Sequence, residues 1–341
     1  MILRALADLD HNSEPLEMAD LAVPEPGEGE VRIRVAVCGV CHTELDEIEG
    51  RLPPPRLPVV LGHQAVGRVE ALGAGAPGLR EGDRVGVAWI GWACGRCKAC
   101  LAGTENLCPF FRATGRDADG GYAEFMTVPA AFAHPVPETL TDVEAAPLLC
   151  AGAIGYRSLK LASIENGEAL GLTGFGASAH LVLKMARHRY PDSRVYVFAR
   201  SEKERAFARE LGAVWAGKSD EEPPEKLAAI IDTTPAWQPV VEALKSLEPR
   251  GRLVINAIRK EERDKSALLA LDYPRDLWLE KEIKSVANVA RADVRDFLAL
   301  AAEIPIHPEV QEYPLESANQ ALRELKERKI RGAKVLRIAE P

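Results

Sequence analysis

The chain has 341 residues, enough for two domains, and its hydrophobic share of 47% and charged share of 28% are typical of a globular protein. A net charge of −8 with scattered Lys and Arg argues against nucleic acid as a partner. No apolar run reaches the roughly 18–20 residues of a membrane span, and the charged N-terminus does not resemble a signal peptide, so we expect a cytoplasmic protein.

Residues 1–150 alternate short β-rich runs with turns that are rich in Gly and Pro. The clearest runs are VRIRVAV (31–37), AVGRVEAL (65–72), GDRVGVAWI (82–90) and YAEFMTV (122–128). This pattern predicts a compact, mostly antiparallel, β-rich domain.

From residue 151 to 288 the texture changes to alternating strands and helices. The predicted buried parallel strands are EALGLTG (168–174), RVYVFAR (194–200), LAAIIDTT (227–234), GRLVINAI (251–258) and EIKSVAN (282–288). Helical runs such as EKERAFARELG (202–212) and PVVEALKSLEP (239–249) lie between them. Such alternation predicts a doubly wound parallel sheet and an α/β fold.

Beyond residue 289 the sequence predicts two helices and a last strand. The runs are VRDFLALAAEI (294–304), ANQALRELKERK (318–329) and AKVLRI (333–338). From the sequence alone, they either extend the parallel sheet or return to the first domain.

Four of the seven cysteines fall within fifteen residues, at Cys94, Cys97, Cys100 and Cys108. We call residues 94–108 the cysteine loop. Four thiolates with the spacing C-x2-C-x2-C-x7-C can converge on one tetrahedral ion, and a shell of four thiolates leaves no position for a substrate. The spacing therefore predicts a structural zinc site. An iron–sulfur cluster is the competing metal, and disulfides are disfavoured in a chain without a secretory signal.

Cys41, His63 and Cys150 form a second candidate set, which we call the trio. Each has an ordinary alternative, because a single cysteine or histidine is more often a packed or hydrogen-bonded residue than a ligand. Polar neighbours (His42 and Thr43) and the position of Cys150, where the two textures meet, favour chemistry. Two thiolates and one imidazole leave a fourth zinc position free for a substrate. Spacing alone does not decide between the two interpretations.

A glycine-rich turn follows the first strand of the parallel-sheet region. Gly174, Gly176 and Ala179 fit the pattern G-x-G-x-x-A between a strand and an apolar-periodic helix, which is the dinucleotide-binding fingerprint. The first glycine makes the tight turn, the second admits the pyrophosphate, and the helix N-terminus faces the phosphates. The sequence therefore predicts a dinucleotide cofactor.

The end of the next predicted strand bears on the choice of cofactor. NAD-binding chains usually place a carboxylate about twenty residues after the fingerprint, against the ribose 2′-hydroxyl. Here Ala199, Arg200 and Ser201 occupy that place. Without a carboxylate to repel a 2′-phosphate, and with a guanidinium to bind it, the sequence favours NADP(H) over NAD(H). The alternative is that Arg200 is only a solvent-facing residue at a helix start.

Together, these motifs resemble the zinc-containing alcohol dehydrogenases of the medium-chain dehydrogenase/reductase superfamily. Besides the cysteine loop and the fingerprint, the resemblance rests on CGVCHTEL, LGHQAVGRV, GDRVGV, GGYAEF and PLLCAGAIGYRSL. It covers nearly the whole chain. It implies a GroES-like catalytic domain (1–150, completed by 289–341) and a Rossmann domain (151–288) inserted into it.

Position by position, the resemblance implies roles for most candidate residues. The trio becomes the catalytic zinc ligands, the cysteine loop becomes the structural site, and Cys38 matches no ligand position and is assigned to packing. The remaining implied roles are a hydroxyl that accepts the substrate proton (Thr43), a pyrophosphate contact (His42), a carboxylate that orients the ligating histidine (Glu44), the neighbour of that histidine (Gln64) and a bulky residue lining the alcohol pocket (Trp89).

Three positions depart from the family pattern. Gln64 stands where a glutamate able to ligate zinc transiently is common. Asp46 stands where a relay histidine is common. Ala333 stands where an arginine usually binds the pyrophosphate, and Lys334 or Arg331 is the nearest substitute.

The implied reaction is reversible hydride transfer between a primary or aromatic alcohol, or its aldehyde, and NADP(H) or NAD(H), with two zinc ions per chain. Thr43 takes the alcohol proton, which leaves through Asp46, His42 or ordered water. Trp92 and Phe110 are further apolar candidates for the pocket, with packing roles equally open. The family also implies a homodimer or homotetramer.

Three other functions share part of the pattern. A zinc-free quinone or enoyl reductase has the same two-domain plan but lacks both cysteine sets. A zinc-ribbon interaction module explains the cysteine loop and leaves the fingerprint unexplained. A non-catalytic cofactor-binding protein requires that the open zinc site be occluded.

Overall fold

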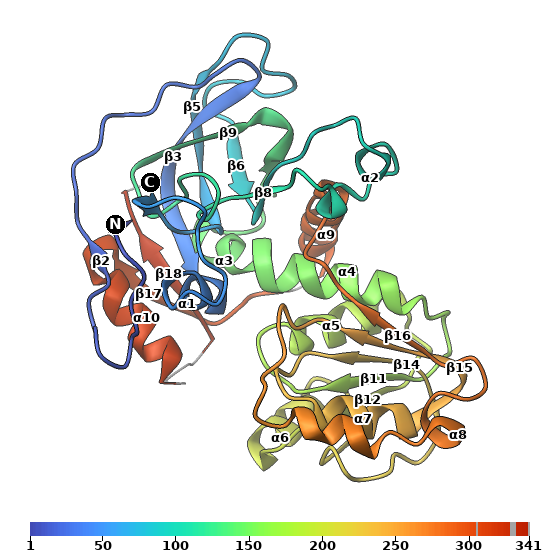
Figure 1. Cartoon of the computed structure of the whole chain (residues 1–341). Coiled ribbons are helices and arrows are strands. Elements are labelled where there is room, and N and C mark those ends of the chain that lie inside the picture. Colours follow the sequence, from blue (N-terminus) through green and yellow to red (C-terminus); the bar gives the residue numbers. More distant parts are fainter. Residues whose placement is uncertain (305, 328–331, 340–341) are drawn as a thin grey trace. The chain divides into compact units, whose positions relative to one another are not determined.

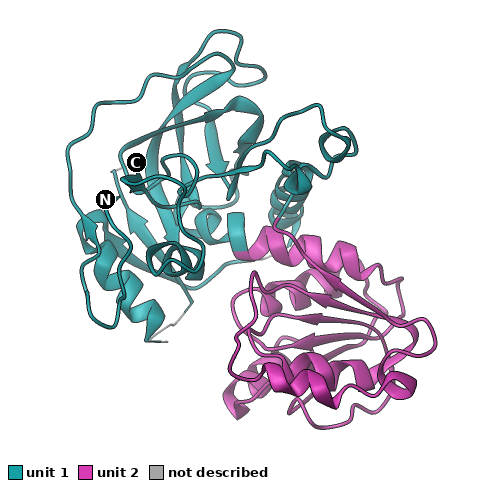
Figure 2. Cartoon of the chain, in the orientation of Figure 1, with its two compact units in different colours: residues 1–150, 289–341 teal, residues 151–288 magenta. Residues whose placement is uncertain are grey.

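The computed structural model describes residues 1–304, 306–327 and 332–339, and the chain divides into two compact units (Figure 2). Unit 1 comprises Met1–Cys150 and Val289–Pro341, and unit 2 comprises Ala151–Asn288. Among the described residues, no helix is long and apolar enough to cross a membrane.

Unit 1 is built on a seven-stranded sheet (Figure 1). Six strands follow the order β10-β6-β5-β3-β18-β17, and the seventh, β9, pairs with β3. Every pair in it is antiparallel except β17–β18. The strands are β3 (Glu30–Val40), β5 (Ala65–Leu72), β6 (Arg84–Val87), β9 (Phe125–Pro129), β10 (Ala133–Pro135), β17 (Val310–Pro314) and β18 (Ala333–Arg337). The mostly antiparallel prediction is confirmed.

The C-terminal segment returns to this sheet instead of extending the parallel one. Its elements are α9 (Arg291–Glu303), β17, α10 (Ala318–Lys326) and β18. β18 pairs with the long central strand β3, with Leu336 opposite Cys38. The sequence left this choice open and did not predict β17, whose five residues lack an apolar run.

Short elements complete unit 1. A small sheet joins β2, β1 and β4, and β7 pairs with β8. The remaining bounds are β1 (Ile2–Leu3), β2 (Leu16–Glu17), β4 (Val59–Val60), β7 (Ile90–Trp92), β8 (Arg112–Ala113), α1 (His42–Ile48), α2 (Lys98–Leu101) and α3 (Asp142–Pro147).

Unit 2 contains a six-stranded sheet with the order β13-β12-β11-β14-β15-β16, and all its strands are parallel. In chain order this is 3-2-1-4-5-6, the Rossmann arrangement, so the predicted fold class is confirmed. The strands are β11 (Leu170–Thr173), β12 (Val195–Phe198), β13 (Trp215–Gly217), β14 (Leu227–Asp232), β15 (Leu247–Ile255) and β16 (Glu282–Ser285). The helices are α4 (Ala153–Ala162), α5 (Ala179–Arg189), α6 (Glu202–Glu210), α7 (Gln238–Ser246) and α8 (Tyr273–Asp276).

One strand prediction was wrong in its burial. The run EIKSVAN was predicted to form a buried strand, but all four residues of β16 are exposed because β16 is the last strand of the sheet. The alternation of Glu282 and Lys284 with Ile283 and Ser285 is the pattern of an edge strand.

Candidate active site

Helix α1 begins directly after Cys41, and its capping interactions hold this member of the trio in place. Cys41 Sγ accepts a hydrogen bond from the Thr43 N–H at 3.4 Å, and the Cys41 N–H donates to Glu44 Oε2 at 2.8 Å. This is a capping box with a cysteine in the position that Ser or Thr usually fills. The backbone hydrogen bond fixes the position of the sulfur atom, which as a thiolate is able to ligate a metal.

The trio converges in unit 1 although its members lie far apart in the sequence. Its three ligand atoms all lie within 4.8 Å of one another, and Cys41 Sγ is 3.5 Å from His63 Nε2. Zinc–ligand bonds of about 2.3 Å to sulfur and about 2.0 Å to nitrogen predict a separation of about 3.5 Å for tetrahedral geometry. The residues therefore fit one zinc ion, and three protein ligands leave its fourth position open.

One carboxylate connects two members of the trio. Glu44 Oε2 accepts from the Cys41 backbone, while Glu44 Oε1 lies 2.6 Å from His63 Nδ1. Both contacting side chains are buried, with 0% and 1% exposure. The contact turns His63 Nε2 toward the sulfur, as carboxylates do for metal-ligating histidines.

Cys150 is positioned by an irregular helical turn. Residues Leu148–Gly152 form a π-helical turn between α3 and α4, and Pro147 lies directly before it. Proline lacks the N–H of a regular helix and clashes with the carbonyl four residues earlier, which favours a wider turn. Such turns occur often at functional sites. Contact with Cys150 and burial raise the pKa of the Cys41 thiol, because both disfavour a negative charge on its sulfur. A cation between the two sulfur atoms would offset this effect.

The cysteine loop brings its four sulfur atoms together in the same way. They lie within 4.8 Å of one another, with Cys94–Cys100 at 3.9 Å and Cys97–Cys100 at 3.5 Å. Tetrahedral zinc with four sulfur ligands predicts separations of about 3.8 Å. The Arg96 backbone N–H is the main contribution that lowers the pKa of Cys94 to about 6. These residues fit a closed, structural zinc site.

A part-buried ion pair attaches the cysteine loop to α9, and sequence reasoning missed it. Glu105 is 3% exposed, and its Oε1 accepts from the backbone N–H of Arg291 at 3.0 Å and from its Nε at 2.7 Å. The Arg291 guanidinium also lies over the Phe132 ring, 5.0 Å from its centroid. The two charged partners are 186 positions apart, so no local signal pairs them.

The predicted relay residues lie on α1 in different environments. His42 is exposed and Thr43 is half-buried, whereas Asp46 is buried and accepts from Arg51 Nε at 2.5 Å. Arg51 also pairs with Glu49 at the C-terminal end of α1.

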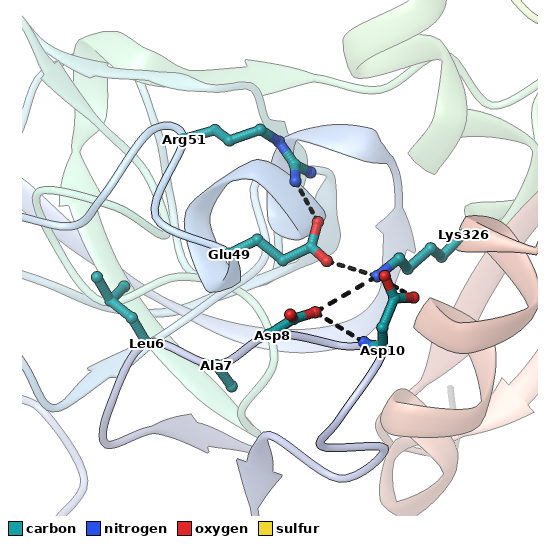
Figure 3. Close-up of a pocket in the computed structure, with 7 residues that line it drawn as sticks. All are labelled: Leu6, Ala7, Asp8, Asp10, Glu49, Arg51 and Lys326. Atoms are coloured by element: carbon teal, nitrogen blue, oxygen red, sulfur yellow. Dashed lines mark hydrogen bonds and ion pairs between the residues drawn. The ribbon is translucent and has the colours of Figure 1, made fainter.

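Charged residues surround that end of α1, opposite the end that carries Cys41. They line a pocket of about 530 Å³, together with Leu6 and Ala7. Figure 3 shows Lys326 of α10 reaching toward Asp8, Asp10 and Glu49, with Nζ 2.7 Å from both Asp10 and Glu49. This ion-pair network connects the N-terminal segment, α1 and α10, and so fixes the helix that carries Glu44.

The hypothesis that Lys334 replaces a pyrophosphate-binding arginine was wrong. Its side chain is 0% exposed, and Nζ donates to Glu324 Oε2 at 2.6 Å, to Tyr313 Oη at 2.5 Å and to Gln311 Oε1 at 3.2 Å. A buried lysine whose Nζ already has three hydrogen-bond partners cannot bind a cofactor. Arg331 lies outside the described residues.

The fingerprint turn has the geometry that its glycines predict. Gly174 has φ 78°, and a Cβ built on it would lie 2.9 Å from Thr233 Oγ1. No described atom lies within 4 Å of a Cβ built on Gly176, so the backbone is open there. Ala179 is the first residue of α5 and is fully buried, which permits close packing of helix and sheet.

The end of β12 presents no side-chain carboxylate. Ala199 is buried, Arg200 is exposed, and Ser201 is the N-cap of α6. Arg205 Nη1 donates to the carbonyl oxygens of Ala199 and Arg200 at 2.8 and 2.9 Å and so fixes this turn. The nearest acid, Glu202, is paired with Arg205 and with a second arginine of α6.

Three aromatic residues were candidates for the alcohol pocket. Trp89 lies 5.2 Å from Phe111, centroid to centroid, and its indole N–H donates to the buried Glu47, which sequence reasoning missed. Trp92 instead lies against Arg112, with the guanidinium 4.9 Å from its ring centroid. Phe110 is 61% exposed.

Within unit 1, Gln64 is buried beside the trio at 3% exposure.

A Rossmann sheet, together with an antiparallel unit that holds these two ligand sets, defines a medium-chain dehydrogenase. Residues 27–138 match the alcohol dehydrogenase GroES-like domain. A probable alcohol dehydrogenase, AdhA, of Mycobacterium tuberculosis is 44% identical over 95% of this chain and 93% of its own. The chain therefore belongs to the zinc-type medium-chain alcohol dehydrogenase family.

Two solved structures share the fold over its full extent. A cobalt- and zinc-bound thermostable alcohol dehydrogenase from Pyrobaculum aerophilum is 26% identical, with TM-score 0.83 over 99% of this chain and 100% of that one. A cinnamyl alcohol dehydrogenase from Sorghum bicolor is 27% identical, with TM-score 0.81 over 100% and 99%.

Proposed function

We propose that the protein is a zinc-dependent alcohol dehydrogenase that interconverts primary or aromatic alcohols and their aldehydes, with NADP(H) preferred over NAD(H). The observation that carries this proposal is the convergence of the trio. Its 3.5 Å sulfur–nitrogen separation suits one tetrahedral zinc ion with an open position. The cysteine loop accounts for a second zinc ion per chain.

The chain's own residues hold the reactants and transfer the proton of the alcohol. When bound, zinc supplies a Lewis acid and the nicotinamide exchanges the hydride. Glu44 fixes the orientation of His63, and the Thr43 hydroxyl accepts the proton of the alcohol. His42, which is exposed and adjacent, passes this proton to solvent. Asp46, our other candidate for the relay, acts only when its ion pair with Arg51 opens.

Two observations favour aromatic alcohols as substrates. The rings of Trp89 and Phe111 pack against each other in a tilted arrangement and supply apolar area, and a cinnamyl alcohol dehydrogenase shares the fold. Steady-state kinetics with both cofactors against a panel of aliphatic and aromatic alcohols and aldehydes test the assignment. Nicotinamide binding without turnover of any panel member would instead support the non-catalytic cofactor-binding protein.

The same assay tests the cofactor preference. Arg200→Ala is expected to raise the KM for NADPH at least about tenfold, since a charge-assisted hydrogen bond contributes about 1.5–3 kcal/mol. The KM for NADH is expected to stay nearly constant. Lys203→Ala, an exposed cation three residues further along, is the matched control. Equal effects of Arg200→Ala on both cofactors would contradict the proposed role.

We also propose that two copies associate through β16. Within the described part of the chain, the outer edge of this strand pairs with no other strand. Its sequence is complementary to itself, since antiparallel pairing about Ile283 places Glu282 opposite Lys284 of the second copy. Ile283 is 46% exposed, and the nearby chain exposes Leu269 (89%), Trp278 (53%) and Leu279 (52%).

Sedimentation is expected to give a mass of at least twice 37.1 kDa, and Ile283→Lys is expected to lower it. A monomeric wild type would contradict the interface.

The seven free cysteines, with six of them in thiolate-rich ligand sets, suit a reducing compartment, so we propose a cytoplasmic location.

A further inference from the structure

Glu47 is a buried acid that the proposed reaction does not use. It lies on α1, three residues after Glu44, and its side chain is completely buried. Its Oε1 accepts a hydrogen bond from Trp89 Nε1 at 3.4 Å. Its Oε2 has no hydrogen-bond partner within the described part of the chain. Burying a carboxyl group that is only half-satisfied costs free energy, so its one contact is informative.

The contact suits a carboxyl group that stays neutral. Burial, and then the nearby charge of Glu44, raise the pKa of Glu47 well above its usual value. A neutral carboxyl group accepts the indole N–H without placing a second negative charge beside Glu44. It therefore holds Trp89 at a lower electrostatic cost than an ionised group would.

Trp89 is held on several sides, all within unit 1. Its ring lies against Phe111 at 5.2 Å with an interplanar angle of 46°, and its carbonyl oxygen accepts from the Thr114 N–H at 2.8 Å. The indole of Trp89 is half-buried, and among the described residues only Glu47 accepts a hydrogen bond from its N–H. The carboxyl group thus selects one orientation of the ring.

We propose that Glu47 is a positioning residue that fixes the indole plane of Trp89 and thereby sets the preference of the alcohol pocket for substrate size. This inference rests on the proposed function, since it needs Trp89 to line the pocket. Glu47 acts through Trp89 and takes no part in the chemical step. It connects α1, which carries Thr43, to the residue that selects the substrate.

A double-mutant cycle tests this coupling. The variants are Glu47→Leu, Trp89→Phe and the pair, and the readout is the ratio of kcat/KM for benzyl alcohol to kcat/KM for ethanol. Loss of one hydrogen bond predicts a change of about three- to tenfold in this ratio for Glu47→Leu. In the Trp89→Phe background, which has no N–H donor, Glu47→Leu is expected to leave the ratio unchanged. Glu47→Gln, which retains an acceptor oxygen, is expected to stay within about twofold of the wild type.

A merely structural role predicts otherwise. Equal losses for both alcohols, or the same effect of Glu47→Leu in both backgrounds, would overturn the proposal. So would a Glu47→Gln variant that behaves like Glu47→Leu. Zinc content measured for each variant separates these effects from damage to the metal site.

A measurement without turnover keeps the test independent of the proposed function. The five tryptophans give five indole N–H resonances in protein labelled with ¹⁵N-tryptophan, and the one missing in Trp89→Phe belongs to Trp89. Glu47→Leu is expected to shift this resonance most. If the wild type oxidises no alcohol, the proposed function fails. If the Trp89 resonance does not respond to Glu47→Leu, the positioning role fails.

Discussion

Cys150→Ala is expected to lower kcat/KM for alcohol oxidation by at least about 1000-fold and to reduce the zinc content from two ions per chain to one. A catalytic zinc ion contributes several kcal/mol to the stabilisation of charge, and each 1.4 kcal/mol corresponds to a factor of ten in rate. Removing one of three protein ligands leaves Cys41 and His63, too few to keep the ion in place.

Cys38→Ala is the matched control for this prediction. Cys38 is completely buried in unit 1, close to Gly62 and Gly121, but does not belong to the trio. The same chemical change there should leave two zinc ions and nearly normal turnover. Steady-state kinetics and elemental analysis of both variants measure the contrast. A Cys150→Ala variant that retains both zinc ions and its turnover would refute the catalytic assignment of the trio.

Local patterns predicted most of the fold. Alternation of strands and helices predicted the parallel sheet of unit 2, in which every strand pair except β11–β14 joins strands that are consecutive in the chain. The burial of β16 was predicted wrongly, because an apolar residue does not reveal that a strand is the last in its sheet. The return of β18 to β3 is a long-range pairing, which local sequence does not encode.

The parts of the site that belong to sequence motifs were predicted. The spacing of the cysteine loop identifies it directly, whereas the trio was assembled through the family resemblance, since spacing does not join Cys41 to Cys150. Glu47 and Glu105 were missed because the sequence does not distinguish a buried acidic residue from an exposed one when its partner is distant in the chain. Lys334 was misjudged for the same reason, since its partners Glu324 and Tyr313 come from other elements.

Cys100→Ala is expected to remove the second zinc ion and to lower Tm by roughly 10 °C, while kcat/KM well below Tm stays within about tenfold of the wild type. Cys100 is the ligand whose sulfur contacts both Cys94 and Cys97. The cysteine loop has little core of its own, because Leu101 and Leu107 are 77% and 56% exposed. Its order therefore depends on the metal and on the ion pair at Glu105.

Loss of that order has a local signature. Trypsin is expected to cut Cys100→Ala at Arg96 or Lys98, which flank the ligands, while Cys38→Ala stays resistant. Because Glu105 of the loop binds the first residue of α9, loosening should spread to that helix and raise its amide hydrogen exchange. If amide hydrogen exchange increases only in residues 94–108, the ion pair keeps α9 ordered without the metal. An unchanged Tm with one zinc ion per chain would show that the loop is ordered by its protein contacts alone.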